Sequence, residues 1–93
     1  VTKVFVIPIG TQKESMKIVQ QIRDGGLNAE IDLMGRGVSK NLNYANSLGI
    51  PFVVFVGEEE MKQNKIKLRN MLDGKEELLF LPEAMKSIVA KLL

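Results

Sequence analysis

The chain has 93 residues, of which 45% are hydrophobic and 26% charged, and its net charge is +2. This length and composition are typical of one globular domain spanning residues 1–93, and they exclude a disordered, collagen-like or coiled-coil chain. Since cysteine and histidine are both absent, disulfides, thiolate chemistry and the commonest general base are excluded, and we expect no catalytic residue, metal site or cofactor site.

The first third of the chain predicts a strand, a helix and a second strand. Lys3–Ile9 is a nearly continuous apolar run, which is typical of a strand covered on both faces in a parallel sheet. T-Q-K-E, which begins at Thr11, predicts a capping box at the start of a helix that ends at Gly25 and Gly26. A short strand is predicted at Asn28–Leu33.

A loop and a second helix are predicted next. Gly35-Arg36-Gly37 is flexible, and its arginine is about as well suited to reach a ligand as to be solvated. Ser39 predicts an N-cap, and Gly49 ends the helix. One face is expected to be buried, at Leu42, Ala45 and Leu48. The opposite face is polar, at Lys40, Asn43, Asn46 and Ser47.

The remaining elements are three strands and a closing helix. Pro51–Val56 is the most hydrophobic segment and predicts the central strand. Lys65–Arg69 alternates, so that Ile66 and Leu68 face the core while Lys65, Lys67 and Arg69 share the other face. Asp73-Gly74 predicts a turn into a strand at Glu76–Phe80. Pro82 opens the last helix, whose buried side is predicted to be Met85, Ile88, Val89 and Leu92.

The order of elements, strand-helix-strand-helix and then three strands and a helix, predicts the fold class. Two right-handed crossovers build a parallel core, and a short turn adds an antiparallel strand beside the third strand. We therefore expect an α/β fold, specifically a three-layer α/β/α sandwich. No apolar run approaches the ~18 residues of a membrane helix and the first residues lack a signal-peptide pattern, so no membrane association and a cytoplasmic location are expected.

Charged residues after the central strand are the candidates for a binding site. Glu58 and Glu59 are best interpreted as a solvated run, whereas Glu60 can face Arg69 across the following turn, either as a surface salt bridge or as a recognition pair. Lys65 and Lys67 suit two roles equally, protection of an edge strand and attraction of phosphate. The loop at Ile9-Gly10-Thr11 favours a structural turn over a phosphate pocket, since it lacks a glycine-rich fingerprint.

Four motifs resemble one known family. F-V-I-P-I-G near the start, G-R-x-x-S-K-x-L-x-Y-A-x-x-L-G-I-P-F in the middle, then V-G-E-E-E and K-L-R-N-M-x-x-G-K-E, are similar to the C-terminal anticodon-binding domain of class II aminoacyl-tRNA synthetases. The resemblance spans essentially the whole chain and is greatest for the histidyl enzymes. It implies a five-stranded mixed sheet flanked by three helices, in agreement with the order of elements above.

The resemblance also implies a function and a set of site residues. Such a domain grips the anticodon stem-loop of a transfer RNA, here a histidine tRNA with the anticodon G-U-G. Glu60 and Arg69 match the family's anticodon-reading acid and base. A carboxylate can accept both N1–H and N2–H of guanine, and arginine can donate to base oxygens or to phosphate. Further anticodon contacts are expected from Arg36, Lys40 and Asn43, and backbone contacts from Lys65 and Lys67.

The resemblance further implies a larger parent protein. Its separate catalytic domain uses ATP and magnesium to charge the tRNA, and the parent is expected to be a homodimer. The alternatives are the corresponding domain of a threonyl, prolyl or glycyl enzyme, or a noncatalytic accessory or dimerisation module of the same family. A small-molecule or phospho-signalling α/β domain has the same order of elements, but the sequence offers no site for it.

Overall fold

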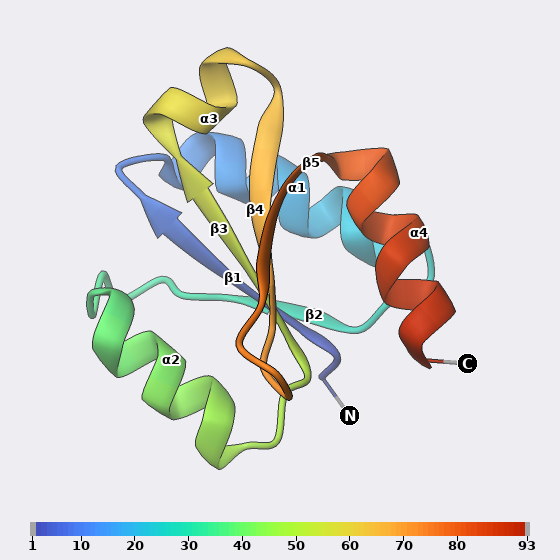
Figure 1. Cartoon of the computed structure of the whole chain (residues 1–93). Coiled ribbons are helices and arrows are strands. Elements are labelled where there is room, and N and C mark those ends of the chain that lie inside the picture. The colour runs from blue at the N-terminus through green and yellow to red at the C-terminus, as the bar shows by residue number, and fades with distance from the viewer. Residues whose placement is uncertain (1, 93) are drawn as a thin grey trace.

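The computed structural model describes residues 2–92 (Figure 1). Their helices and strands follow in the order β1 (Val4–Ile9), α1 (Gln12–Asp24), β2 (Ala29–Ile31), α2 (Val38–Ser47), β3 (Phe52–Gly57), α3 (Glu58–Lys62), β4 (Lys65–Asn70), β5 (Glu76–Phe80) and α4 (Leu81–Leu92). None of the helices within this described part is both long and apolar enough to cross a membrane.

The strands form one mixed sheet in the order β2-β1-β3-β4-β5. β1 is parallel to β2 and β3, whereas β4 is antiparallel to both β3 and β5. Every residue of β3 is buried, as expected for a strand with neighbours on both sides and helices above and below. The predicted central position of this strand is therefore confirmed.

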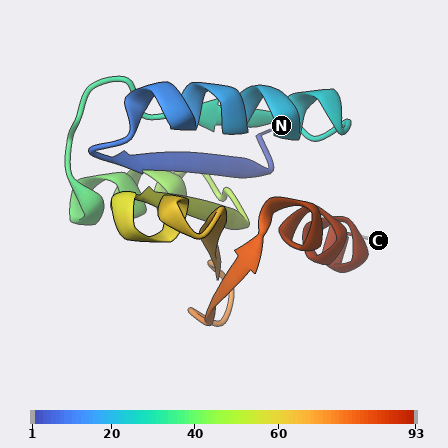
Figure 2. The ribbon, with the colours of Figure 1, turned by 90° about the horizontal axis from the view of Figure 1, so that it is seen from above.

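The helices cover the two faces of the sheet unequally. α1 and α4 cover one face through a core that includes Val19, Ile22 and Ile88, and α2 covers the other through Ala45 (Figures 1 and 2). This confirms the three-layer sandwich. Because α2 packs chiefly on β1, the α2 side of β4 and β5 is left open, and Leu78 and Phe80 on β5 are 45% and 46% exposed.

The alternation predicted for β4 is confirmed. Ile66 and Leu68 are buried on the side of α1 and α4, whereas Lys65, Lys67 and Arg69 are partly exposed on the open side. Asn70 and Lys75 close the hairpin, and Gly74 has a φ of 74°, a value that glycine adopts without strain. The Asp73-Gly74 turn is also confirmed.

Thr11 is the N-cap of α1, as predicted, but its capping box does not form, and the predicted N-cap of α2 is wrong. The Thr11 side chain is buried against β3, where its hydroxyl donates to the Val56 carbonyl at 2.5 Å, so no side-chain cap forms on α1. α2 begins before Ser39, at Val38, and its N-cap is Gly37 with a φ of 91°. Ser39 therefore lies inside the first turn, where its side chain cannot serve as an N-cap.

Four further differences concern element lengths and burial. The three glutamates form α3, a short fourth helix where three were expected, because acidic side chains stabilise the first turn of a helix. β2 is shorter than the predicted strand. Leu48 is 52% exposed because it follows the end of α2, and Val89 and Leu92 are 40% and 37% exposed because no described element covers that side of α4.

Candidate functional site

A small cavity lies where the carboxyl ends of β1 and β3 meet the open side of β4. Its volume is about 260 Å³, and it is lined by Ile9, Val38, Phe55, Glu60, Lys67 and Glu76. These residues come from β1, α2, β3, α3, β4 and β5. Ligands of open α/β sheets bind at this edge, so we take this cavity and the adjoining open face of β4 and β5 as the candidate site.

Glu60 is held at the rim of the cavity by the turn from β3 into α3. Its carboxylate folds back over Gly57: a Cβ added to this glycine would lie 2.2 Å from Oε1 of Glu60. Glu60 is partly buried, whereas Glu58 and Glu59 are exposed, and Glu59 pairs with Lys62 at 3.5 Å. The surroundings of Glu60 thus differ from those of its two neighbours.

Arg69 lies farther along the same face and pairs with Glu76 rather than with Glu60. The distance from its Nη1 to Oε2 of Glu76 is 2.8 Å, and Lys67 Nζ lies 4.0 Å from the other oxygen of that carboxylate. The register explains why Arg69 does not pair with Glu60. Lys67 is opposite Phe55, near the carboxyl end of β3 where Glu60 follows, and Arg69 is two residues, or about 6.6 Å, farther from that end. Glu76 was not identified from the sequence.

The loop before α2 is built around a buried carboxylate, Asp32. Asp32 accepts hydrogen bonds from the backbone N–H groups of Met34 and Arg36, at 2.9 and 3.2 Å, and from the side-chain amide of Asn41 at 2.7 Å. The Arg36 guanidinium lies 3.4 Å from Asp32 and 4.5 Å from the centre of the Tyr44 ring. Arg36 is therefore a fixed side chain rather than a freely solvated one.

These contacts set the pKa of Asp32. Burial alone raises the pKa of this carboxyl, but the hydrogen bonds from Asn41, Met34 and Arg36, together with the charge of Arg36, outweigh burial. The pKa of Asp32 is therefore held below its ordinary value of 3.8. Its ionised form stabilises the loop next to the cavity.

The other predicted contact residues surround the cavity at greater distance. Lys40 and Asn43 are exposed on α2. Lys65 lies on the open face of β4 with its Nζ 5.1 Å from the centre of the Phe80 ring. Tyr44 on α2 packs on Phe5 with ring centres 5.3 Å apart.

The site combines cations, one unshared carboxylate and apolar walls. No ion pair of Glu60 occurs among residues 2–92, and this part of the chain holds no group of three acidic, histidine or cysteine side chains placed to bind a metal ion. Such a surface can accept hydrogen bonds from a ligand at Glu60 while attracting negative charge along β4. The apolar walls, Ile9 and Val38, were also missed from sequence, since their proximity depends on how β1 and α2 meet.

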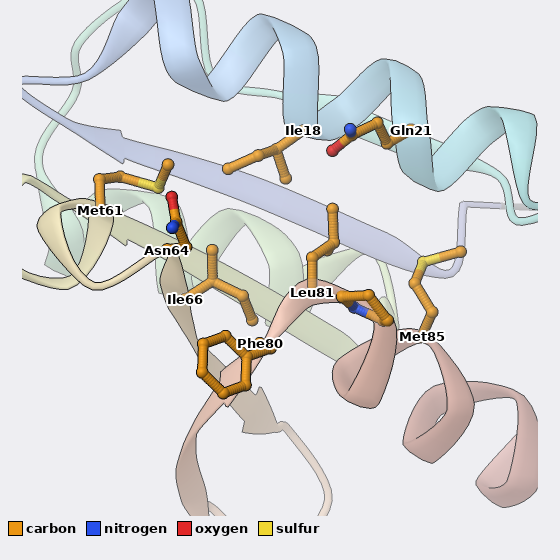
Figure 3. Close-up of a pocket in the computed structure, with 9 residues that line it drawn as sticks. Ile18, Gln21, Met61, Asn64, Ile66, Phe80, Leu81 and Met85 are labelled. Carbon is orange, nitrogen blue, oxygen red and sulfur yellow. The ribbon is translucent and has the colours of Figure 1, made fainter.

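A larger groove lies on the opposite face of the sheet, between α1 and α4 (Figure 3). Its volume is about 600 Å³, and side-chain amides of Gln21 and Asn64 lie among apolar residues such as Ile18, Met61 and Leu81. Lysine and arginine do not appear in its described lining. We therefore take the smaller cavity, which has Lys67 in its wall, as the candidate site for a negatively charged ligand.

Comparison with known proteins gives one consistent result. The family described as "Anticodon binding domain" matches residues 3–91. The chain is 45% identical over 74 residues to histidine–tRNA ligase 1 of Bacillus cereus, which covers 78% of this chain and 17% of that protein. It is 40% identical over 84 residues to the histidine–tRNA ligase of Methanococcus maripaludis, covering 86% of this chain and 20% of that one.

A solved structure gives the same answer. The crystal structure of histidyl-tRNA synthetase from Nostoc sp. PCC 7120 superposes with a TM-score of 0.92 and 26% identity, over 99% of this chain and 23% of that chain. The chain spans about a fifth of the length of the curated relatives it matches. The similarity therefore concerns one domain of those proteins.

Proposed function

Because the chain belongs to the anticodon-binding domain family, we propose that it binds the anticodon stem-loop of a histidine tRNA as one domain of a histidine–tRNA ligase. The names of the similar proteins support the histidine assignment. Because the relatives at 40–45% identity are histidine–tRNA ligases, the histidyl assignment is favoured over the threonyl, prolyl and glycyl alternatives.

The observation that carries the proposal is the open, basic face of β4 beside the Glu60 cavity. Lys65, Lys67 and Arg69 follow one another on that face, which no helix covers among the described residues. Their spacing, about 6.6 Å between successive residues on one face, is close to the repeat of phosphates in an extended single strand. Lys65 and Lys67 are proposed to bind the RNA backbone there.

Glu60 is proposed to read a guanine. The cavity has a volume of about 260 Å³, which is room for one flat base. The Glu60 carboxylate would accept hydrogen bonds from N1–H and N2–H of that base, while Ile9 and Val38 supply apolar contact. Arg69 is proposed to donate to a second base or a phosphate.

Residues on the α2 side are proposed to flank the loop of the RNA. Arg36, fixed by Asp32 and Tyr44, presents a cation at the amino end of α2. Lys40 and Asn43 are exposed on the same helix and are available to bases or backbone. These contacts position the loop rather than specify it.

The rest of the ligase reaction is assigned to parts of the parent outside this domain. In the proposed parent, a homodimer acting in the cytoplasm, a separate catalytic domain would use ATP and magnesium to attach histidine to the tRNA. Two carboxylates line the cavity, Glu60 and Glu76. Glu76 already pairs with Lys67 and Arg69, so of the two only Glu60 has no ion pair among the described residues. The cavity fits a base better than a nucleotide triphosphate with its metal.

The proposal is tested by titrating two stem-loops into the protein at two salt concentrations. One carries the G-U-G anticodon, and in the other both guanines are replaced by adenine. We expect the first to bind more tightly by about 1–3 kcal/mol. Glu60→Gln should lose most of this preference. A carboxylate can only accept, so it favours the N1–H donor of guanine over the N1 acceptor of adenine, whereas a glutamine amide can pair with either.

Two variants serve as controls. Glu59→Gln removes a neighbouring carboxylate that is exposed and paired with Lys62, and should leave the preference unchanged. Lys67→Gln should weaken binding of both stem-loops alike and reduce the salt slope by about one. Equal affinity of the unmodified protein for both stem-loops would contradict the proposal.

A further inference from the structure

The outer strand of the hairpin places an aromatic ring on the same open face as the lysines of β4. Lys65 is paired with Phe80, Lys67 with Leu78 and Arg69 with Glu76. Paired residues of an antiparallel sheet point to the same side. Leu78 therefore shares the face of the basic residues, whereas the Phe80 ring, at the last position of β5, reaches Lys65 and also lines the groove between α1 and α4.

Phe80 is unusually accessible for its side-chain type. It is 46% exposed, and a cation, Lys65 Nζ, lies 5.1 Å from the centre of its ring. Figure 3 shows Phe80 at the end of the apolar groove away from Ile18 and Gln21 of α1, at the outer edge of the sheet. The ring therefore forms the outer end of that groove and leaves about half of its surface open to solvent.

We propose that Phe80 is a stacking platform for an unpaired base of the bound RNA, with Lys65 and Lys67 holding the phosphates on either side of that base. This inference rests on the proposed function and adds a residue to that site. An exposed aromatic ring beside cations on a sheet is a combination by which single-stranded RNA is bound, because every base has a face that stacks.

The contact of Lys65 with the ring does not oppose stacking. A cation over an exposed ring contributes about 2- to 5-fold to an equilibrium, whereas a base stacked on an aromatic side chain contributes about 5- to 100-fold. A base therefore displaces the ammonium group. The long side chain of Lys65 then carries its charge to a neighbouring phosphate.

The absence of tryptophan from the whole chain gives a direct test. Phe80→Trp makes residue 80 the only indole, and its fluorescence is followed while the G-U-G stem-loop is added. We expect the fluorescence to be quenched, with the same midpoint as binding measured by the anisotropy of end-labelled RNA. In a protein carrying Met16→Trp instead, on an exposed site of α1, RNA should bind without quenching.

Affinity measurements separate stacking from simple apolar contact. Phe80→Leu keeps a large apolar side chain but removes the ring, and should lose about 5- to 100-fold in affinity, whereas Phe80→Trp should bind within about threefold of the unmodified protein. RNA that binds the Leu variant as tightly as the unmodified protein, with no quenching in the Trp variant, would overturn stacking and leave the proposed function intact. Failure of the unmodified protein to bind the stem-loop would overturn both.

Discussion

At the scale of single residues, Asp32 and Asn41 show how a binding loop is fixed from beneath. Both are buried, and their side chains join the end of β2 to the first turns of α2. Their burial was not predicted, since the sequence places Asp32 in a strand and Asn41 in a helix, and polar residues of these types are mostly exposed. The loop between them carries Arg36. Because the Asp32 carboxylate binds both the backbone and the guanidinium of Arg36, the conformation of this loop depends on the ionised form of Asp32.

Asp32 predicts a specific pH dependence of stability. Because its pKa is lower in the folded protein than its ordinary value of 3.8, its stabilising effect is present above that pH and is lost as the pH falls through the folded pKa. Asp32→Asn should lower the free energy of unfolding by about 1.5–3 kcal/mol at neutral pH, because buried donors lose a charged acceptor.

Urea unfolding of both proteins between about pH 7 and about pH 2.5 measures this effect, and the difference between them should shrink toward acid. Asp24→Asn is the matched control, since Asp24 is exposed and accepts a hydrogen bond from Gln20. A difference between Asp32→Asn and the unmodified protein that does not change with pH would show that the charge of Asp32 is unimportant.

At the scale of elements, hydrophobic patterns predicted the strands better than local signals predicted the helix ends. The apolar run of β3 and the alternation of β4 predicted which side chains are buried, and the same side chains are buried in the structure. The capping box at Thr11 and the N-cap at Ser39 failed because they depend on contacts and dihedral angles that a four-residue motif does not contain: the Thr11 hydroxyl bonds to β3, and Gly37 takes the N-cap position of α2. α3 was missed because a run of three glutamates has no apolar period.

The junction of β3 and α3 predicts an effect of Gly57→Ala on recognition rather than on stability. Gly57 has φ −96° and ψ 156°, which alanine adopts easily, but the new Cβ would meet the Glu60 carboxylate at 2.2 Å. We expect the carboxylate to move, the guanine preference to fall, and the free energy of unfolding to change by about 0.5 kcal/mol or less.

A double-mutant cycle with Glu60→Gln tests this explanation. If Gly57→Ala acts through the Glu60 carboxylate, it should have no further effect on base preference once that carboxylate is gone. An equal loss of preference in both backgrounds would mean that Gly57 acts by another route. Stem-loop titrations and urea unfolding supply both quantities.

At the scale of the whole molecule, the fold could be predicted from the sequence, but the pairing of charges across it could not be predicted fully. The strand order follows from the order of elements and the handedness of crossovers. The ion pair of Arg69 depends on the register of the hairpin. Counting back from the Asp73-Gly74 turn places Glu76 opposite Arg69, so this signal was present in the sequence, whereas the cavity walls required the three-dimensional packing.

The charge distribution predicts that Glu76 limits RNA affinity. Its carboxylate partly neutralises Lys67 and Arg69 on the open face. Glu76→Gln should therefore raise affinity for both stem-loops by about 3- to 10-fold at low salt, with the gain shrinking as salt is added. The cost in stability should be about 1 kcal/mol or less, since the ion pairs are partly exposed.

Glu77→Gln is the matched control for this change. Glu77 is adjacent in sequence and has the same charge, but it is paired with Leu68 and lies on the other side of the sheet. RNA titrations of both variants at two salt concentrations distinguish a local effect from one of net charge. Equal gains in the two variants would contradict a specific role for Glu76.

The alternation along β4 has a consequence for how this domain can change over evolutionary time. Ile66 and Leu68 hold the strand in the interior, while the three basic residues between and beside them are only partly buried and lie on the open face. Substitutions at positions 65, 67 and 69 can therefore accumulate without disturbing the core between α1, α4 and the sheet. One strand thus keeps the fold constant on one side while its other side is free to acquire a different nucleic-acid preference.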